Sequence, residues 1–162
     1  MPTDTDLSGL LDGVDYPVFV VTAHHEHEHA GCLVGFTSQV SIDPERLLVC
    51  LSVANHTYGV ASFAPVLAVH LLHRDQADLA ALFGSQTGDE IDKFAHCRWR
   101  PGPGGVRVLH GVAGWMAGAV LERIPFGDHV GFVLDPLEAH RDPAAGILTY
   151  QQVKDLSPGH PA

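Results

Sequence analysis

The sequence predicts a mainly β fold, an antiparallel barrel or sandwich with a few short helices, and three observations support this. Short apolar stretches rich in Val, Leu and Phe recur along the 162 residues, most of them bounded by Pro, Gly, Asp or Asn. Only one segment has clear helical patterning. The apolar stretches also follow one another too closely to leave room for the crossover helices that parallel strands need.

Four apolar stretches and one longer extended segment are the predicted strands. The stretches are Tyr16–Ala23, Arg46–Val53, Val66–Leu72 and His129–Leu134, and the extended segment is Gly31–Ile42 with a turn at Asp43–Glu45. The segment Gly111–Ile124 permits a helix or a long strand. We favour the strand, because glycines at 111, 114 and 118 would weaken a helix.

The clear helix covers Arg74–Gly84, with Asp75 as a plausible N-cap and Gly84 as its stop. A shorter helical turn is expected after Asn55, capped by Asn55 or Thr57. Residues 100–107 read as a surface loop, and residues 156–162 read as a frayed tail.

Composition and charge narrow the function classes. The length predicts one domain over residues 1–162 with a core at about 14–155, and 46% hydrophobic with 17% charged residues is ordinary for a folded protein. The net charge is −10 and the nine Lys and Arg residues are thinly spread, so nucleic acid is not an expected partner. No apolar run reaches the ~18 residues of a membrane span, and the acidic first residues do not resemble a signal peptide. We therefore expect a cytoplasmic protein with no membrane partner.

The stretch Thr22–Gly31 holds four of the twelve histidines, interleaved with two glutamates. On a strand His25, His27 and His29 would share one face, but neighbours roughly 6.6–7 Å apart allow at most two of them to bind one ion. On a helix His25 and His29 would be spaced as in zinc-binding helices, but Ala30-Gly31 ends that pattern. A solvated hairpin loop between two buried strands is the favoured interpretation, and no metal site is predicted. Cys32, Cys50 and Cys97 are interpreted as small core side chains.

Small polar side chains gather at the ends of two predicted strands. They serve as turn and cap residues, or they bind an anion such as phosphate together with backbone N–H groups, and the residues alone do not decide between these roles. The side chains are Thr37, Ser38, Gln39 and Ser41 in one segment, and Ser52, Asn55 and Thr57 in the other.

Gly127-Asp128 between two apolar strands predicts a two-residue hairpin loop. His129 follows directly and is either a structural histidine or one that lines a pocket. The sequence contains no Ser-His-Asp spacing, CxxC pair, phosphate-binding P-loop or GxGxxG.

Taken in order, these segments resemble the flavin reductase family of FMN-binding split barrels, from about Tyr16 to Val153. The resemblance is carried by "PVFVVTA", "GCLVGFTSQVSIDPERLLVCLS", "ANHTYGVAS", "LAVHLL", "LAALFG", "DKF" and "GDHVGF". It implies a Greek-key split β-barrel, usually a homodimer with flavin sites near the subunit interface. It also implies reduction of FMN, FAD or riboflavin by NADH or NADPH, often for a partner monooxygenase.

The resemblance also assigns site residues by position. His129 matches the family histidine on the nicotinamide side of the flavin and is the candidate catalytic residue. The candidate flavin-binding residues are Val34, Gly35, Phe36, Thr37, Ser38, Gln39, Ser41, Ser52, Val53, Ala54, Asn55, Thr57, Lys93 and Phe94.

This chain departs from the family pattern at five positions. Family members commonly have hydroxyl or amide side chains in place of Leu33, Gly35 and Ala54. A basic residue is common where this chain has Val53, and Asn is usual at His70. The expected flavin site therefore lacks a cation and at least two hydrogen-bonding groups.

Three other functions fit the same residues. The barrel could carry electrons on a flavin without using NAD(P)H, or it could bind another cofactor, such as a deazaflavin or haem. The third is a metal-binding module built on His24–His29. Flavin absorbance, its bleaching by NADH and metal analysis separate these alternatives.

Overall fold

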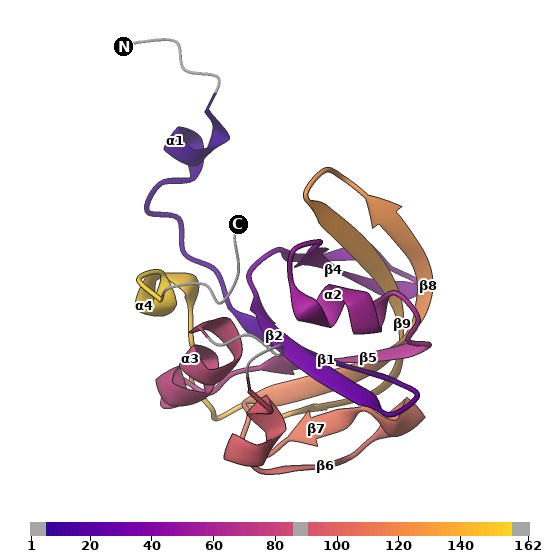
Figure 1. The fold of residues 1–162 in the computed structure, drawn as a ribbon. Helices are drawn as coiled ribbons and strands as arrows, with labels where there is room; N and C mark the ends of the chain where they lie inside the picture. Colours follow the sequence, from indigo (N-terminus) through magenta and orange to yellow (C-terminus); the bar gives the residue numbers. More distant parts are fainter. Residues whose placement is uncertain (1–5, 86–90, 157–162) are drawn as a thin grey trace.

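The fold is built on one antiparallel sheet, and the computed structural model describes residues 6–85 and 91–156. Figure 1 shows the sheet curling into a barrel-like layer with the helix α2 lying against it. In spatial order the strands are β2 (Glu28–Val34), β1 (Phe19–His25), β5 (Val66–Leu71), β8 (Gly114–Pro125), β9 (His129–Arg141), β4 (Glu45–Ser52) and β3 (Thr37–Ile42).

A smaller sheet and six short helices complete the described part of the chain. The second sheet pairs β6 (Trp99–Pro101) with β7 (Arg107–Leu109). The helices are α1 (Leu7–Leu11), α2 (His56–Ala61), α3 (Ala77–Ser85), the 3-10 turns η1 (Lys93–His96) and η2 (Pro103–Gly105), and α4 (Tyr150–Val153). None of these helices combines the length and apolarity needed to cross a membrane.

The order of the strands confirms the predicted mainly β, Greek-key class. Hairpins join β1 to β2, β3 to β4 and β8 to β9, whereas β5 returns to pair with β1 and β4 pairs with β9. A connection that skips neighbouring strands in this way is what a Greek key requires.

The barrel core lies between the inner face of the sheet and α2. Val21, Val49, Leu67 and Phe132 are fully buried there, and Val60 of α2 belongs to the same cluster. Burying a side chain of this size stabilises the fold by about 1.5–3 kcal/mol. A second apolar cluster joins α3, η1 and α4 to the outer face of β1 and to the segments that flank it.

The predicted strands are observed, with one division. The segment Gly31–Ile42 forms two strands, because the chain leaves β1 at Gly35-Phe36 and pairs with β4 instead. The carbonyl of Phe36 accepts a hydrogen bond from the N–H of Cys50 at 2.9 Å, which fixes this change of partner.

Gly111–Ile124 is correctly predicted as a strand, since β8 runs from Gly114 to Pro125. A Cβ at Gly114 would lie 2.9 Å from the carbonyl oxygen of His140, and one at Gly118 would lie 2.9 Å from Cβ of Leu134. These glycines allow β9 to approach closely, so they stabilise the sheet and do not mark a helix break.

The boundaries predicted for α3 are wrong at both ends. The helix begins at Ala77, so Asp75 is not its N-cap, and the side chain of Gln76 accepts a hydrogen bond from the N–H of His73 at 2.8 Å. Gly84 lies inside the helix, where a Cβ would meet Cδ2 of Leu33 at 2.9 Å. The glycine is therefore explained by contact with β2.

Three smaller expectations have mixed outcomes. The loop at residues 100–107 includes the ends of β6 and β7, so it is a hairpin. The expected two-residue turn at Gly127-Asp128 is confirmed, because the N–H of Phe126 donates to the carbonyl of His129 at 3.0 Å. The expected frayed tail lies, from residue 157 onward, outside the described residues, and α4 ends before it at Val153.

Candidate functional site

The candidate site is a cavity of about 470 Å³, here called the α4 cavity, between the barrel and the helices α3 and α4. Its volume falls within the range of roughly 300–1,000 Å³ that small-molecule sites occupy. It is lined by Tyr16, Val18, Cys32, Leu33, Val34, Gly35, Phe36, Cys50, Ser52, Asn55, Phe83, Gly84, Asp128, His129, Tyr150, Val153, Lys154 and Leu156.

Aromatic side chains form much of its wall. The rings of Tyr16 and Tyr150 stack with centroids 4.7 Å apart and planes 9° from parallel. Gly35 lets Tyr16 reach this position, because a Cβ there would come within 2.9 Å of the tyrosine ring. Burial raises the pKa of Tyr16, so its hydroxyl stays neutral near neutral pH. Flat, apolar walls of this kind suit an aromatic ring system.

His129 lies at the start of β9, opposite Ser52 of β4. Its Nδ1 lies 2.7 Å from a carboxylate oxygen of Asp128, and its ring centroid lies 4.9 Å from that of Phe36. A carboxylate only accepts hydrogen bonds, so Nδ1 carries the proton and Nε2 is left for another partner. The pair therefore presents an oriented imidazole to the cavity.

Ser52 and Asn55 join the cavity to the start of α2. The side chain of Asn55 accepts from the N–H of Thr57 at 2.9 Å, which confirms the predicted cap. The hydroxyl of Ser52 accepts from the N–H of Ala54 at 3.2 Å and keeps its own hydrogen as a donor. The capping role is thus observed, and both residues also line the cavity.

Six of the predicted site residues come together here, and the others do not line the cavity. The six are Val34, Gly35, Phe36, Ser52, Asn55 and His129. Thr37, Ser38, Gln39 and Ser41 lie on the edge strand β3, and Val53 and Ala54 are exposed after β4. Thr57 is 1% exposed inside the barrel.

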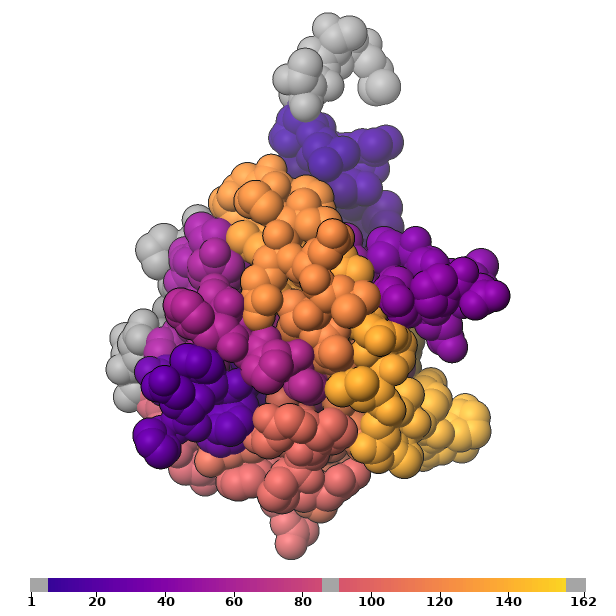
Figure 2. All heavy atoms as spheres, turned by 90° about the vertical axis from the view of Figure 1, so that its right-hand side faces the viewer, coloured from indigo at the N-terminus to yellow at the C-terminus, as the bar shows by residue number. Residues whose placement is uncertain are grey.

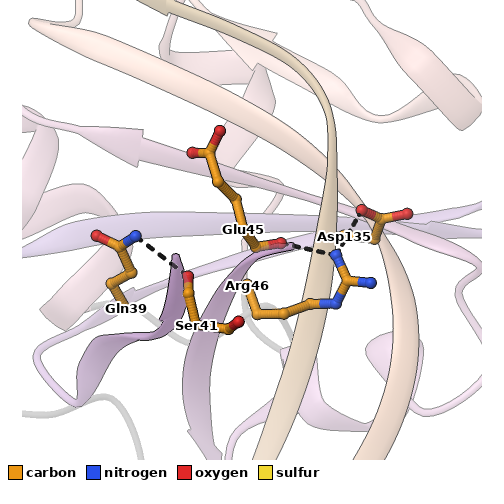
Figure 3. Close-up of polar contacts among 5 residues, drawn as sticks. All are labelled: Gln39, Ser41, Glu45, Arg46 and Asp135. Carbon is orange, nitrogen blue, oxygen red and sulfur yellow. Dashed lines mark hydrogen bonds and ion pairs between the residues drawn. The ribbon is translucent and has the colours of Figure 1, made fainter. Parts of the chain in front are cut away.

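The polar side chains of β3 form hydrogen bonds within their own strand, and Arg46 of the neighbouring β4 bonds to Glu45 and Asp135. Figure 3 shows Gln39 donating to the carbonyl of Ser41 at 3.2 Å. In the same view Arg46 donates to the carbonyl of Glu45 at 2.7 Å and pairs with Asp135 at 2.9 Å. The ion pair joins β4 to β9 and so fixes the strands whose ends carry Ser52 and His129.

Lys93 and Phe94 lie behind the cavity wall. The ammonium of Lys93 donates to the carbonyls of Gly31 and Phe83 at 2.9 and 3.0 Å. Burial lowers the pKa of this amine, and these two carbonyls stabilise its charged form. Phe94 packs edge-on against Phe83 with centroids 5.6 Å apart. Both residues therefore support Phe83, which does line the cavity.

The sequence interpretation missed the wall that comes from α3, α4 and Tyr16. One local signal for α4 was present, because Thr149 and Gln152 form a capping box. The contacts that bring α4 to the cavity are tertiary, with Tyr150 donating its N–H to the carbonyl of Tyr16 at 2.8 Å.

The cysteines are only partly as expected. Cys32 is 1% exposed in the core, but Cys50 and Cys97 are partly exposed. Cys50 lines the cavity, and burial raises its pKa, which keeps it a thiol. A protonated thiol is a poor nucleophile, so this environment does not activate Cys50.

The histidine-rich stretch forms the β1–β2 hairpin, but the expected solvated loop is limited to Glu26 and His27, because the other histidines lie in the two paired strands. His24 pairs with His29 across the strands, their rings stack 4.2 Å apart, and Glu26 takes a positive φ of 54° in the turn. Burial and the nearby Arg107 lower the pKa of His29 to about 4, so it is neutral near pH 7. Within residues 6–85 and 91–156, no three His, Cys, Asp or Glu side chains could hold a metal ion.

Comparison with known proteins identifies similar chains. A model of the flavin reductase like domain matches residues 11–156. The reductase subunit Stc3 of stachydrine N-demethylase from Rhizobium meliloti (strain 1021) is 33% identical over 120 residues, which are 72% of this chain and 50% of that protein. The chain spans 36%, 50% and 63% of the lengths of three curated relatives that it matches.

Two solved structures have the same fold. A flavin reductase structure from Haemophilus somnus 129PT matches with a TM-score of 0.82 at 22% identity, covering 90% of this chain and 92% of the other. The FMN-binding protein of Thermus thermophilus, with 1-cyclohex-2-enone bound, matches with a TM-score of 0.79 at 25% identity, covering 89% and 80%. The predicted split β-barrel is thereby confirmed.

Proposed function

Because the chain belongs to the flavin reductase like domain family, we propose that it is an NAD(P)H-dependent flavin reductase that binds FMN or FAD in the α4 cavity. The observation that supports this best is the cavity itself, where aromatic walls meet hydroxyl, amide and imidazole groups. The name of the relative Stc3, a reductase subunit, also supports reduction on behalf of a partner enzyme.

The residues that line the cavity fit the parts of a flavin. Tyr16, Phe36 and Phe83 suit the flat ring, and Ser52 and Asn55 suit a hydroxylated chain. When both molecules are bound, the flavin supplies the hydride acceptor and the nicotinamide supplies the donor, so no protein nucleophile is needed. The barrel has to orient the two rings and exclude water.

His129 is the proposed orienting residue. Asp128 fixes its tautomer, and the contact with Phe36 fixes its ring, so Nε2 has a defined direction. An imidazole held in this way can orient the nicotinamide side and stabilise charge without exchanging its own proton.

Titration of the purified protein with each flavin and each nicotinamide tests the proposal. We expect quenching of FMN or FAD fluorescence on binding, and loss of the visible flavin absorbance when NADH or NADPH is added without oxygen. Flavin binding without reduction by either nicotinamide would instead identify an electron carrier.

The proposed partner is a monooxygenase that receives the reduced flavin. Stc3 is named as a reductase subunit of a demethylase, and this chain is 33% identical to it. A cytoplasmic location accords with the use of NADH or NADPH. An oxygenase supplied only with oxidised flavin, NADH and this protein should turn over its substrate, and a dialysis membrane between the two proteins should slow but not stop it.

We also propose a homodimer in which β3 faces a second copy. Ile42 is 82% exposed, and Phe36, Val40 and Val53 are each about half exposed nearby. Figure 2 shows this segment, coloured purple around residue 40, standing out from the body of the molecule. A second copy would cover these side chains and bring Thr37, Ser38, Gln39 and Ser41 to the subunit boundary.

Light scattering on a sizing column tests the dimer. The native protein should have twice the mass of one chain, and Ile42→Glu should be monomeric, because a charge would be buried at the interface. Leu10→Glu, at a position that is 76% exposed on α1, is the matched control and should remain dimeric. A monomeric native protein would contradict the dimer and leave the reductase proposal standing.

A further inference from the structure

A phosphorylated flavin in the α4 cavity would be repelled by the negative charge of the protein. The chain carries a net charge of −10, and a phosphate monoester or diphosphate adds more negative charge. Asp128 contributes a carboxylate to the lining, although it is paired with His129 at 2.7 Å. A cation inside or beside the cavity would offset this repulsion.

The cation cannot come from the end of β4. Position 53, directly after Ser52, carries the uncharged, 46% exposed side chain of Val53. The helix that follows, α2, has only six residues, so its N-terminus is a weak source of positive potential. Ser52 and Asn55 offer hydrogen bonds but no charge.

All nine Lys and Arg residues lie in the described part of the chain, and the lining of the cavity includes one of them, Lys154. Arg46 pairs with Asp135, and Arg123 and Arg141 donate to backbone carbonyls of other segments. The ammonium of Lys93 is held by two carbonyls behind the wall.

Lys154 lies directly after α4, on the segment whose Tyr150 stacks on Tyr16. The main chain of this segment is held in place, since the N–H of Gln151 donates to the carboxylate of Asp15 at 3.0 Å. The side chain of Lys154 is exposed, and among the described residues no carboxylate lies within ion-pairing distance of its ammonium. The fold thus anchors the backbone and leaves the charge available.

We propose that Lys154 is the specificity-determining cation of the site, which binds the phosphate of FMN or the diphosphate of FAD. This inference rests on the proposed flavin-binding function and adds the group that distinguishes phosphorylated flavins from riboflavin. The positive charge of the site then comes from Lys154, after α4, because the segment after β4 carries the uncharged Val53.

Fluorescence titration of the purified protein with FMN and with riboflavin tests this role. In Lys154→Gln the Kd for FMN should rise about tenfold, as expected for loss of one partly exposed charge-assisted contact. The Kd for riboflavin should change less than about twofold. The rise in Kd for FMN with ionic strength should also become shallower in the variant.

Two further variants separate the role of Lys154 from general effects. Lys154→Arg keeps the charge and should bind FMN within about threefold of the native protein. Arg98→Gln removes the same charge from an exposed side chain outside the cavity and should leave both Kd values unchanged.

The outcomes also distinguish this inference from the proposed function. If the native protein binds no flavin, both fail. If it binds FMN and riboflavin, but Lys154→Gln weakens both equally or neither, the flavin site stands and the role of Lys154 is wrong. A higher KM for NADH with an unchanged Kd for FMN would likewise overturn the inference, because the charge would then serve the nicotinamide.

Discussion

The β1–β2 hairpin and the α4 cavity distribute their polar side chains in opposite ways. The hairpin concentrates four histidines in six consecutive positions, yet His24 and His29 stack on each other and no group of three ligands forms among the described residues. The cavity draws single residues from segments between Tyr16 and Leu156. A binding site here depends on convergence in space, and local density in the sequence is a poor guide to it.

The largest effect on stability is expected at Phe83, which lines the cavity and is 1% exposed. Phe83→Ala should lower the free energy of unfolding by about 3–5 kcal/mol, because it leaves a void against Gly31 and Phe94. Phe63→Ala, beside His25 of the hairpin and 69% exposed, should cost less than about 1 kcal/mol. Denaturant titration measures both, and equal losses would show that the two regions support the fold alike.

The next effect concerns a buried histidine that belongs to neither region. His70 is fully buried, with Nδ1 2.9 Å from the carbonyl of Val20 and Nε2 accepting from Leu109 at 3.0 Å. Burial lowers the pKa of His70 to about 4, whereas the unfolded value is 6.5. Below pH 6.5 the unfolded state therefore binds the extra proton, so stability is full above that pH and declines as the pH falls toward 4.

His70→Asn tests this linkage, since an amide can donate to Val20 and accept from Leu109 without titrating. The native protein should lose up to about 3 kcal/mol between pH 6.5 and 4 through this group, and the variant should lose correspondingly less. Denaturant midpoints measured across that range provide the test. Parallel curves for the two proteins would rule His70 out as the source.

The third prediction tests the cavity as the place of chemistry. His129→Ala should lower turnover with NADH about 10- to 100-fold, because the imidazole oriented by Asp128 is lost, while the Kd for flavin changes by less than about threefold. His129→Gln retains a polar group and should recover part of the rate. Unchanged steady-state turnover in the alanine variant would remove His129 from the mechanism.

The smallest expected effect is in the hairpin. Replacing both His25 and His27 with Ala should change stability by less than about 0.5 kcal/mol and leave flavin binding unchanged, because His27 is exposed in the turn and His25, at the end of β1, contacts the exposed Phe63. Metal analysis after chelation should show the same low content in both proteins. If chelation inactivates the native protein and added zinc restores its activity, the hairpin is a functional metal site and the contrast drawn with the cavity is wrong.

The sequence was informative where the cause of structure was local. Asn55 caps α2 by a hydrogen bond to Thr57, two residues away. The glycines at 114 and 118 correctly indicate a strand and not a helix. Gly84 was misread, because a glycine that ends a helix and one that admits Leu33 look alike without the tertiary partner. Lys93 resembled a ligand contact for the same reason, since only the fold shows its ammonium held by Gly31 and Phe83.

The α4 wall could not be derived from local patterns. Its four-residue helix is too short for apolar periodicity to reveal, and the capping box at Thr149 predicts a helix start without saying what the helix covers. The aromatic pair of Tyr16 and Tyr150 joins residues separated by most of the barrel. Such pairings follow from topology, which a single sequence specifies only through the whole fold.

The bridge between Pro17 and Thr149 has a consequence for how the protein is made. Ribosomes deliver the chain from its N-terminus, so Tyr16 emerges well before the segment that stacks on it. The hairpins can pair as they appear, but the pocket gains its second wall only after nearly all of the barrel has been synthesised. Until that segment emerges, the nascent barrel has no complete ligand pocket, so ligand-induced stabilisation becomes available only after Tyr150 has been added.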